Sequence, residues 1–224
     1  MDAMESKIKL THTVTKSNHF QKNVKKKQAW SHRQWIIKTV NIPSIWDDEV
    51  EYTNQLILED IRNNSAWNQR WFATHYGKKR PPSVEKAKNE AEYAIKITLE
   101  DPYNESPLRY LVALVREQHK LNEQYNHDND DGGSGENCTA TCSDYTSFLN
   151  DVESEIQQLK ETLGCGNDCP TLISALIDIL EMKGNPNSII QAADMANELA
   201  LKFDVVRKKY WLMREGKLRS IHSS

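Results

Sequence analysis

Apolar residues recur at helical spacing along most of the chain. Between residues 45 and 61 the apolar side chains share one helical face, formed by Trp46, Val50, Ile57 and Ile61. A second face follows Pro81-Pro82-Ser83 and consists of Val84, Ala87, Ala91, Ala94, Ile95 and Thr98. Proline and serine before a periodic segment mark a helix start. The pattern therefore predicts two amphipathic helices, each burying one face against neighbouring helices.

The helical pattern continues after residue 104 and is interrupted by one polar segment. We expect a flexible acidic and glycine-rich insertion at residues 125–143, because its centre, 127–136, is too polar to repay the entropy lost on ordering it. Helical signals resume near Tyr145 and predict C-terminal hairpins over residues 144–220, with helices at 170–182, 186–203 and 205–218. Residues 1–21 show only a brief alternation of apolar and polar positions, and we expect them to be disordered.

A tryptophan and arginine motif repeats along the chain. Trp30-Ser-His-Arg33 and Trp67-Asn-Gln-Arg70 share the pattern Trp-x-x-Arg, and each is followed by another tryptophan, Trp35 and Trp71. A degraded copy begins at Asn104-Glu-Ser-Pro-Leu108, where Leu108 takes the position of Trp67. Successive copies are spaced by about 40 residues without glycine-rich turns, a period typical of two-helix repeats. The spacing predicts an all-α superhelical array of antiparallel helix hairpins, with repeats over residues 22–124.

The repeated residues have a structural interpretation and a functional one. Trp30, Trp35, Trp67 and Trp71 could form an aromatic box for an isoprenoid, but aromatic side chains at helical spacing favour a core between hairpins. We expect Arg33 and Arg70 to pair with acids or helix-end carbonyls of a neighbouring repeat. His32 is interpreted as a structural hydrogen bonder, since no serine or cysteine nearby suggests a nucleophile for it.

Composition narrows the class of function. The 224 residues have a formal net charge of −3 with both signs mixed along the chain, which argues against a nucleic-acid-binding surface. The start of the chain lacks a signal-peptide pattern, and the longest apolar run, 172–180, is shorter than the roughly 20 residues that span a bilayer. These features predict a cytoplasmic protein without membrane insertion.

Two patterns resemble metal sites only superficially. The cysteines form two Cys-x-x-x-Cys pairs, Cys138 with Cys142 and Cys165 with Cys169, a wider spacing than zinc knuckles usually have. Asp47-Asp48-x-x-Glu51 resembles an aspartate-rich magnesium diphosphate motif, but acids in a first helical turn explain it better. The sequence has no glycine-rich phosphate loop and no nucleophile elbow, which disfavours a self-contained enzyme. We expect no metal bound by this chain.

The segments 29–37 (AWSHRQWII) and 62–72 (RNNSAWNQRWF) resemble consecutive repeats of the α subunit of the CaaX protein prenyltransferases, farnesyltransferase and geranylgeranyltransferase type I. Pro102-Tyr-Asn-Glu-Ser106 is similar to the next repeat start, and Asp204-Val-Val-Arg-Lys-Lys-Tyr-Trp211 is similar to the closing helix of that subunit. The resemblance covers residues 22–124 well and 168–220 moderately. It implies a right-handed crescent of hairpins that wraps around a β subunit.

The resemblance also implies a division of labour. The family's β subunit holds the catalytic zinc, with magnesium as a second candidate ion of the holoenzyme, and most of the isoprenoid pocket. The implied partners are this β subunit, an isoprenyl diphosphate and a protein ending in CaaX. The family's main catalytic lysine belongs to a repeat one hairpin upstream of Trp30 that this sequence lacks, so the resemblance assigns no catalytic residue. Lys26, Lys27 and Gln28 occupy the positions of the family's Asn-Tyr-His and are the candidate substrate-binding residues.

Alternatives remain open at the level of the sequence. Lys22, Lys25, Lys26 and Lys27 could offer positive charge to a leaving diphosphate, or they could be a solvated helix entrance, which is the commoner role of a charge run. The chain could also be a non-catalytic helical-repeat scaffold, or a fragment from an incomplete gene model. The α subunit of the Rab geranylgeranyltransferase shares the repeats but fits the segment 207–211 less well.

Overall fold

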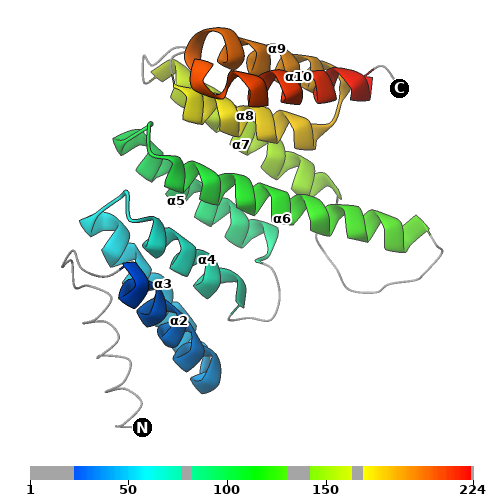
Figure 1. Ribbon diagram of the computed structural model, residues 1–224. Helices are drawn as coiled ribbons and strands as arrows, with labels where there is room; N and C mark the ends of the chain where they lie inside the picture. Colours follow the sequence, from blue (N-terminus) through cyan, green and yellow to red (C-terminus); the bar gives the residue numbers. More distant parts are fainter. Residues whose placement is uncertain (1–22, 77–81, 131–141, 163–168, 223–224) are drawn as a thin grey trace. The chain divides into compact units, whose positions relative to one another are not determined.

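The computed structural model describes residues 23–76, 82–130, 142–162 and 169–222 (Figure 1). Within these ranges every regular element is a helix, so the all-α class and the organisation into helix hairpins are confirmed. The α-helices are α2 (Asn23–Val40), α3 (Pro43–Glu59), α4 (Asn64–Tyr76), α5 (Val84–Glu100), α6 (Glu105–Asp130), α7 (Cys142–Thr162), α8 (Pro170–Lys183), α9 (Pro186–Glu198) and α10 (Lys208–His222). A π-helical turn, Leu199–Phe203, and a 3₁₀ turn, Val205–Arg207, connect α9 to α10. None of the described helices is both long enough and apolar enough to cross a lipid bilayer.

The chain divides into two compact units, residues 1–81 and 82–224. The first unit contains α2, α3 and α4, of which α3 and α4 form an antiparallel hairpin. Helix α3 begins at Pro43, whose missing N–H needs no partner in a first turn. Asn41 adopts a positive φ of 44° before this start and accepts a hydrogen bond from the indole N–H of Trp46 at 3.3 Å. Buried apolar side chains of all three helices then meet in one cluster of Ile37, Ile45, Trp46 and Phe72.

The turn that begins each repeat has the same hydrogen bonds in both units. Asp60 and Asp101 occupy equivalent positions of the repeat, and they end α3 and α5 in an extended conformation. The backbone N–H of Asn63 donates to the Asp60 carbonyl at 2.9 Å, and that of Asn104 donates to the Asp101 carbonyl at 3.0 Å. Each asparagine side chain then accepts an N–H from the first turn of the next helix. The repeat seen in the sequence is therefore a repeat of backbone geometry.

The second unit contains α5 to α10. Helix α5 packs against α6 and α7, α8 packs against α6, α7 and α9, and α10 packs against α9. Its largest fully buried side chains come from five of these helices and are Ile97, Leu111, Leu114, Phe148, Ile156, Leu172, Ile177 and Trp211. The predicted buried face of α5 is confirmed for Ala87, Ala91, Ala94, Ile95 and Thr98, whereas Val84 is only partly buried. The core of this unit thus lies between successive hairpins, as repeat proteins require.

Local residues fix the sharp turn between α8 and α9. Gly184 ends α8 with a φ of 69°, a left-handed conformation in which a side chain would be strained. Asn185 then caps α9, because its side-chain oxygen accepts the Ser188 N–H at 2.8 Å, and Pro186 occupies the first helical position. These residues confirm the predicted helices at 170–182 and 186–203, although the end of the latter forms the π turn.

The expected insertion has the wrong boundaries. Helix α6 continues to Asp130 and α7 already begins at Cys142, so both ends of the 125–143 segment are helical. Once a helix is formed, each added residue gains a hydrogen bond at little cost, and polar residues can extend it beyond its last apolar contact. The remainder of the expected insertion, residues 131–141, and the N-terminal segment 1–21 lie outside the described residues.

Candidate functional site

A buried ion pair joins the first two helices of the first unit. Arg33 and Glu49 are 1% and 2% exposed, and the guanidinium of Arg33 donates to both carboxylate oxygens of Glu49, with Nε to Oε1 at 2.7 Å. Gln69 of α4 also donates to Glu49 Oε1 at 2.7 Å, and its own amide oxygen accepts from Gln34 at 3.0 Å. The Arg33 guanidinium also lies 4.1 Å from the centre of the Tyr52 ring. Arg33 therefore pairs with an acid of the neighbouring helix, which is one of the two kinds of partner expected for it.

Half of this network recurs in the second unit. In the register set by the repeated turn, Glu90 takes the position of Glu49, and Tyr110 takes the position of Gln69. The Tyr110 hydroxyl donates to Glu90 Oε2 at 2.6 Å, just as Gln69 donates to Glu49. Neither glutamate was predicted as a paired residue, although their shared register with the repeated turn was a signal that could have identified them. Their role is structural, since each carboxylate links two helices of one unit.

The acidic segment at the start of α3 separates into buried and exposed members. Asp47 and Asp48 are exposed, while Glu49, the acid between them and Glu51, is committed to Arg33. Because α3 begins at Pro43, these acids lie in its second turn, and the expectation that they occupy the first turn is wrong. They nevertheless do not converge on one point, as carboxylates that share a magnesium ion would.

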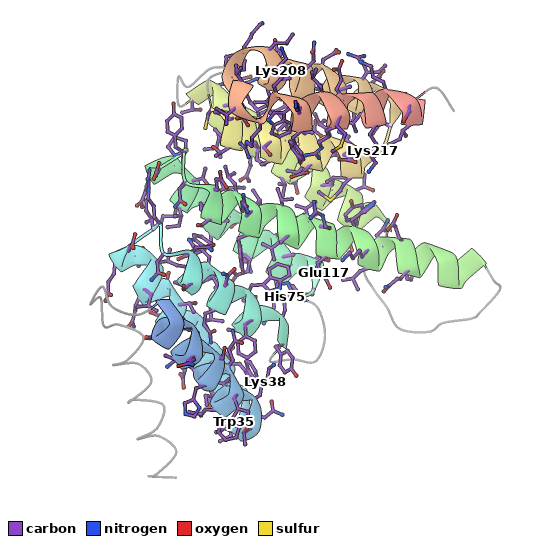
Figure 2. The ribbon with its side chains drawn as sticks, viewed as in Figure 1. Trp35, Lys38, His75, Glu117, Lys208 and Lys217 are labelled. Carbon is purple, nitrogen blue, oxygen red and sulfur yellow. The ribbon has the colours of Figure 1, made fainter. Side chains whose placement is uncertain are left out.

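The four repeat tryptophans differ in burial. Trp67 is 2% exposed and donates its indole N–H to the Ile61 carbonyl at 3.1 Å, so its predicted core position is confirmed. Trp30 and Trp71 are partly buried, and Trp71 stacks on His75 with ring centres 3.5 Å apart. Trp35 is 60% exposed, and the prediction that it belongs to the core is wrong (Figure 2).

Helical geometry explains why Trp35 departs from the others. Residues on a helix are separated by about 100°, so Trp35 lies roughly opposite Arg33, which faces α3. Its equivalent in the next copy of the tryptophan and arginine motif is Phe72, which is buried in the cluster that includes Ile37 of α2. The same repeat position is thus covered by a preceding helix in one copy and exposed in the other. His32, interpreted as a structural hydrogen bonder, is exposed and stacks on Trp35 at 5.7 Å.

The candidate substrate-binding residues lie in the first turns of α2. Gln28 is exposed, and Lys25, Lys26 and Lys27 belong to the helix, although their side chains lie outside the described part. Lys22 lies outside it altogether. Arg70 is buried at 6% exposure, as expected for a structural member of the repeat. No described contact joins the candidate residues into a site.

The described residues offer no candidate metal centre. Within them, no group of three or more histidine, cysteine, aspartate or glutamate side chains lies close enough to hold an ion. Cys169 is buried, and its thiol donates to the Pro102 carbonyl at 3.2 Å, beside the hydroxyl of Thr171 at 2.8 Å from the same oxygen. Cys138 and Cys165 are not among the described residues.

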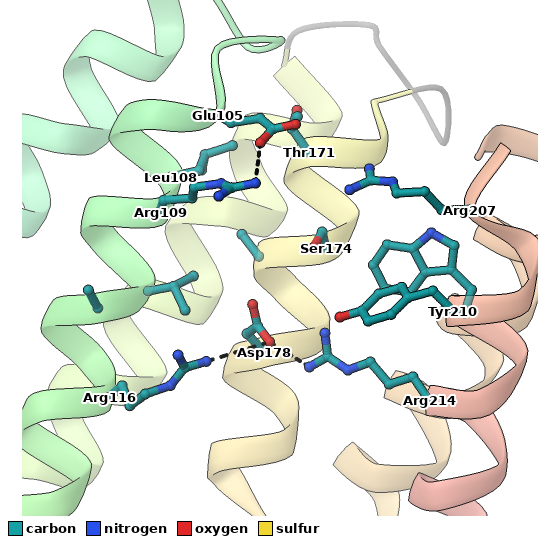
Figure 3. A pocket seen from close by; sticks show the side chains of 14 residues that line it. Glu105, Leu108, Arg109, Arg116, Thr171, Ser174, Asp178, Arg207, Tyr210 and Arg214 are labelled. Carbon is teal, nitrogen blue, oxygen red and sulfur yellow. Dashed lines mark hydrogen bonds and ion pairs between the residues drawn. The ribbon is translucent and has the colours of Figure 1, made fainter. Parts of the chain in front are cut away.

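The second unit has an open groove of about 520 Å³ between α6, α8 and α10 (Figure 3). Four arginines line it, two from α6 and two from the α10 side: Arg109, Arg116, Arg207 and Arg214. Asp178 of α8 lies between Arg116 and Arg214, and its carboxylate is 3.9 Å from the first guanidinium and 2.5 Å from the second. Burial lowers the pKa of Arg214, but the charges and hydrogen bonds of Asp178 and Glu181 outweigh it and raise that pKa overall. No motif in the sequence indicates this groove.

Comparisons with known proteins agree with the repeat geometry. Residues 46–76, which span α3 and α4, match the model of the protein prenyltransferase alpha subunit repeat. The protein farnesyltransferase/geranylgeranyltransferase type-1 subunit alpha of Pisum sativum is 30% identical over 180 residues, covering 77% of this chain and 49% of that protein. The proteins of the same name from Arabidopsis thaliana and Dictyostelium discoideum are 28% and 26% identical, covering 77% and 74% of this chain and 49% and 43% of their own lengths.

The chain therefore spans about half the length of the curated relatives that it matches. The matched repeat is the one whose turn, buried glutamate and core tryptophan are described above, and it recurs in the second unit with the same turn. On this evidence the chain belongs to the family of proteins built from the protein prenyltransferase α-subunit repeat.

Proposed function

We propose that this chain acts as the α-type subunit of a heterodimeric protein prenyltransferase. With a β subunit, it would transfer a farnesyl or geranylgeranyl group from the diphosphate to the cysteine of a C-terminal CaaX sequence. The observation that carries the proposal is the similarity to type-1 α subunits over about three quarters of the chain, together with the match of residues 46–76 to the α-subunit repeat. The cytoplasm is the proposed location.

The chemistry of the reaction divides the roles of the two subunits. The cysteine sulfur forms a bond to the isoprenoid carbon while the carbon–oxygen bond to diphosphate breaks, so negative charge grows on the leaving group. A zinc ion, supplied by the β subunit, would hold the sulfur as a thiolate. This chain would contribute a rigid helical edge and the positive charge of Lys25, Lys26 and Lys27 near Gln28. The buried Arg33 to Glu49 pair would hold that edge in position, since it anchors α2 to α3.

The test is co-expression with a type-1 prenyltransferase β subunit in the presence of zinc. We expect a stable heterodimer by size-exclusion chromatography, better soluble than the chain expressed alone, because repeats that lack neighbours expose apolar surface. Transfer of a farnesyl group to a CaaX peptide is then measured against a full-length α and β pair. We expect measurable transfer that is slower than that of the full-length pair, because this chain spans about half the length of its curated relatives.

Two outcomes separate the candidate roles. If the heterodimer forms and transfers the isoprenoid, replacing Lys25, Lys26 and Lys27 by alanine reports whether these lysines serve the diphosphate or are only solvated. If the heterodimer forms without transfer, the chain is a non-catalytic scaffold, the second candidate function. A monodisperse chain that melts cooperatively and does not bind the β subunit contradicts the proposal, and binding to a Rab-type β subunit instead would point to the Rab-specific enzyme.

A further inference from the structure

The arginine groove of the second unit is built in two layers. Three pairs of residues seven positions apart line it, Arg109 with Arg116, Thr171 with Asp178, and Arg207 with Arg214. Seven residues are two helical turns, or about 10 Å. One layer therefore holds Arg116, Asp178 and Arg214, and the other holds Arg109, Thr171 and Arg207. In each layer the two arginines lie on opposite sides of the groove (Figure 3).

The layer of Asp178 shows how this groove binds a carboxylate. Asp178 projects between two guanidinium groups and forms ion pairs with both, at 2.5 Å to Arg214 and 3.9 Å to Arg116. Arg214 is further held by Glu181 at 2.7 Å and is largely buried. This layer is thus internally neutralised and is a structural element that ties α10 and α6 to α8.

The layer of Thr171 lacks a carboxylate on α8. Thr171 uses its hydroxyl to donate to the Pro102 carbonyl, and the side chains of Arg109 and Arg207 are 75% and 45% exposed. Arg109 pairs with Glu105 at 2.5 Å, and Arg207 pairs with Asp204. A guanidinium group carries five N–H donors, so these single ion pairs leave donors of both arginines directed at the groove.

The other walls of the groove are apolar or aromatic. Leu108, Val112 and Ala175 are buried along its floor, and the rings of Tyr210 and Trp211 form one side. An occupant must therefore combine a carboxylate with apolar atoms. A free diphosphate fits poorly, because Glu105, Asp178 and Asp204 would repel its several charges and the floor would leave it partly desolvated.

We propose that this groove is a docking site for an acidic segment of the partner β subunit, which inserts an aspartate or glutamate carboxylate between Arg109 and Arg207 and packs its neighbouring apolar side chains on Tyr210 and the groove floor. The inference rests on the proposed function for the identity of the partner. It follows from local charge complementarity between the two layers, since Asp178 places a carboxylate between two arginines, whereas Thr171 leaves the space between Arg109 and Arg207 without a carboxylate from α8.

The test compares β-subunit binding by the whole chain and by Arg109→Glu/Arg207→Glu. Both arginines are exposed, so the double variant should keep the helical circular dichroism and the melting temperature of the parent. We expect its dissociation constant to rise by about tenfold or more, mostly through slower association, and to depend less steeply on salt. Lys96→Glu/Lys208→Glu is the matched control, because it makes the same change of charge at exposed positions outside the groove and should change binding less than about twofold.

Amide hydrogen exchange supplies a second measurement. On binding the β subunit, residues 105–116 and 207–214 should gain protection in the parent and not in the double variant. If the double variant is less stable than the parent, Arg109→Gln/Arg207→Gln, which removes the charges without reversing them, replaces it in both measurements.

The outcomes distinguish the two proposals. If the parent chain does not bind the β subunit, the proposed function fails and the groove assignment is overturned with it. If the parent binds and the double variant binds equally well, the groove assignment alone is overturned. Competition by millimolar inorganic pyrophosphate, with loss of that competition in the double variant, would also overturn it, by showing that a small anion occupies the groove.

Discussion

The indole N–H of Trp67 donates to the carbonyl oxygen of Ile61 at 3.1 Å and thereby closes the turn that begins its repeat. In the copy of this turn in the second unit, Leu108 replaces the tryptophan and Pro102 occupies the position of Ile61. The Pro102 carbonyl is not left without a donor, because Thr171 and Cys169 of the next hairpin donate to it. A hydrogen bond within one repeat has thus been replaced by hydrogen bonds from a neighbouring hairpin.

These hydrogen bonds predict that Thr171 stabilises the second unit by donating its hydroxyl to the Pro102 carbonyl. Thr171→Val keeps the shape of the side chain and removes the hydroxyl, which should cost about 1 kcal/mol of unfolding free energy because the weaker thiol donor of Cys169 remains. Adding Cys169→Ala removes both donors and should bring the total cost to about 2 to 4 kcal/mol. Urea unfolding followed by circular dichroism measures both. Ser174→Ala, one turn further along α8, is the control, and an equal effect there would contradict the assignment.

The ion pair of Arg33 with Glu49 predicts a strong asymmetry between single and double variants. Glu49→Leu leaves the buried guanidinium uncompensated and should destabilise the first unit by about 3 to 5 kcal/mol. Arg33→Met/Glu49→Leu removes both charges and should recover most of that loss, since apolar pairs of similar volume often replace buried ion pairs. Glu51→Gln on the exposed side of α3 should change stability by less than about 0.5 kcal/mol. Chemical denaturation measures all three, and a double variant no more stable than Glu49→Leu would refute the interpretation.

The exposure of Trp35 predicts unequal fluorescence quenching among the tryptophans. Trp35→Phe should remove the component that acrylamide quenches most readily, because the Trp35 ring is largely in solvent. Trp67→Phe should instead remove a poorly quenched component, because that ring is buried. Stern–Volmer plots of the two variants and the parent provide the measurement. The assignment fails if Trp35→Phe leaves the accessible fraction unchanged.

The buried phenol of Tyr145 predicts a loss of stability at alkaline pH. Burial, followed by the negative charge of Glu123, raises the pKa of Tyr145 from 10.0 to about 12, and its hydroxyl lies 2.9 Å from His119 Nδ1. The folded state therefore favours the protonated phenol, and this stabilisation is complete below pH 10 and is lost as the pH rises toward 12. Melting temperatures measured from pH 8 to pH 12 should fall less steeply for Tyr145→Phe than for the parent. Tyr125→Phe, at an exposed position, is the control and should follow the parent.

Helix content could be predicted because it depends on local information. The helix starts near Pro43, Ser83 and Pro186 could be predicted from the residue types. The Ser83 side chain accepts a backbone N–H of the first turn, and the two prolines have no N–H that needs a partner there. The repeat was readable because Trp67 and Leu108 occupy one register and the same turn precedes both. The last residue of α6 and the first residue of α7 were predicted less well, because polar residues extend a helix without leaving an apolar pattern.

The sequence by itself therefore determined the helices and their repeat, since spacing along a chain fixes which side chains share a helical face, and it left acids and helix-end carbonyls as the expected partners of Arg33. Only the tertiary structure decided that Glu49 is that partner, that Trp35 is exposed where Phe72 is buried, and that four arginines from two helices and a 3₁₀ turn line one groove. These features depend on which helix covers which face. That choice is made by packing between residues far apart in the chain, and no local pattern encodes it.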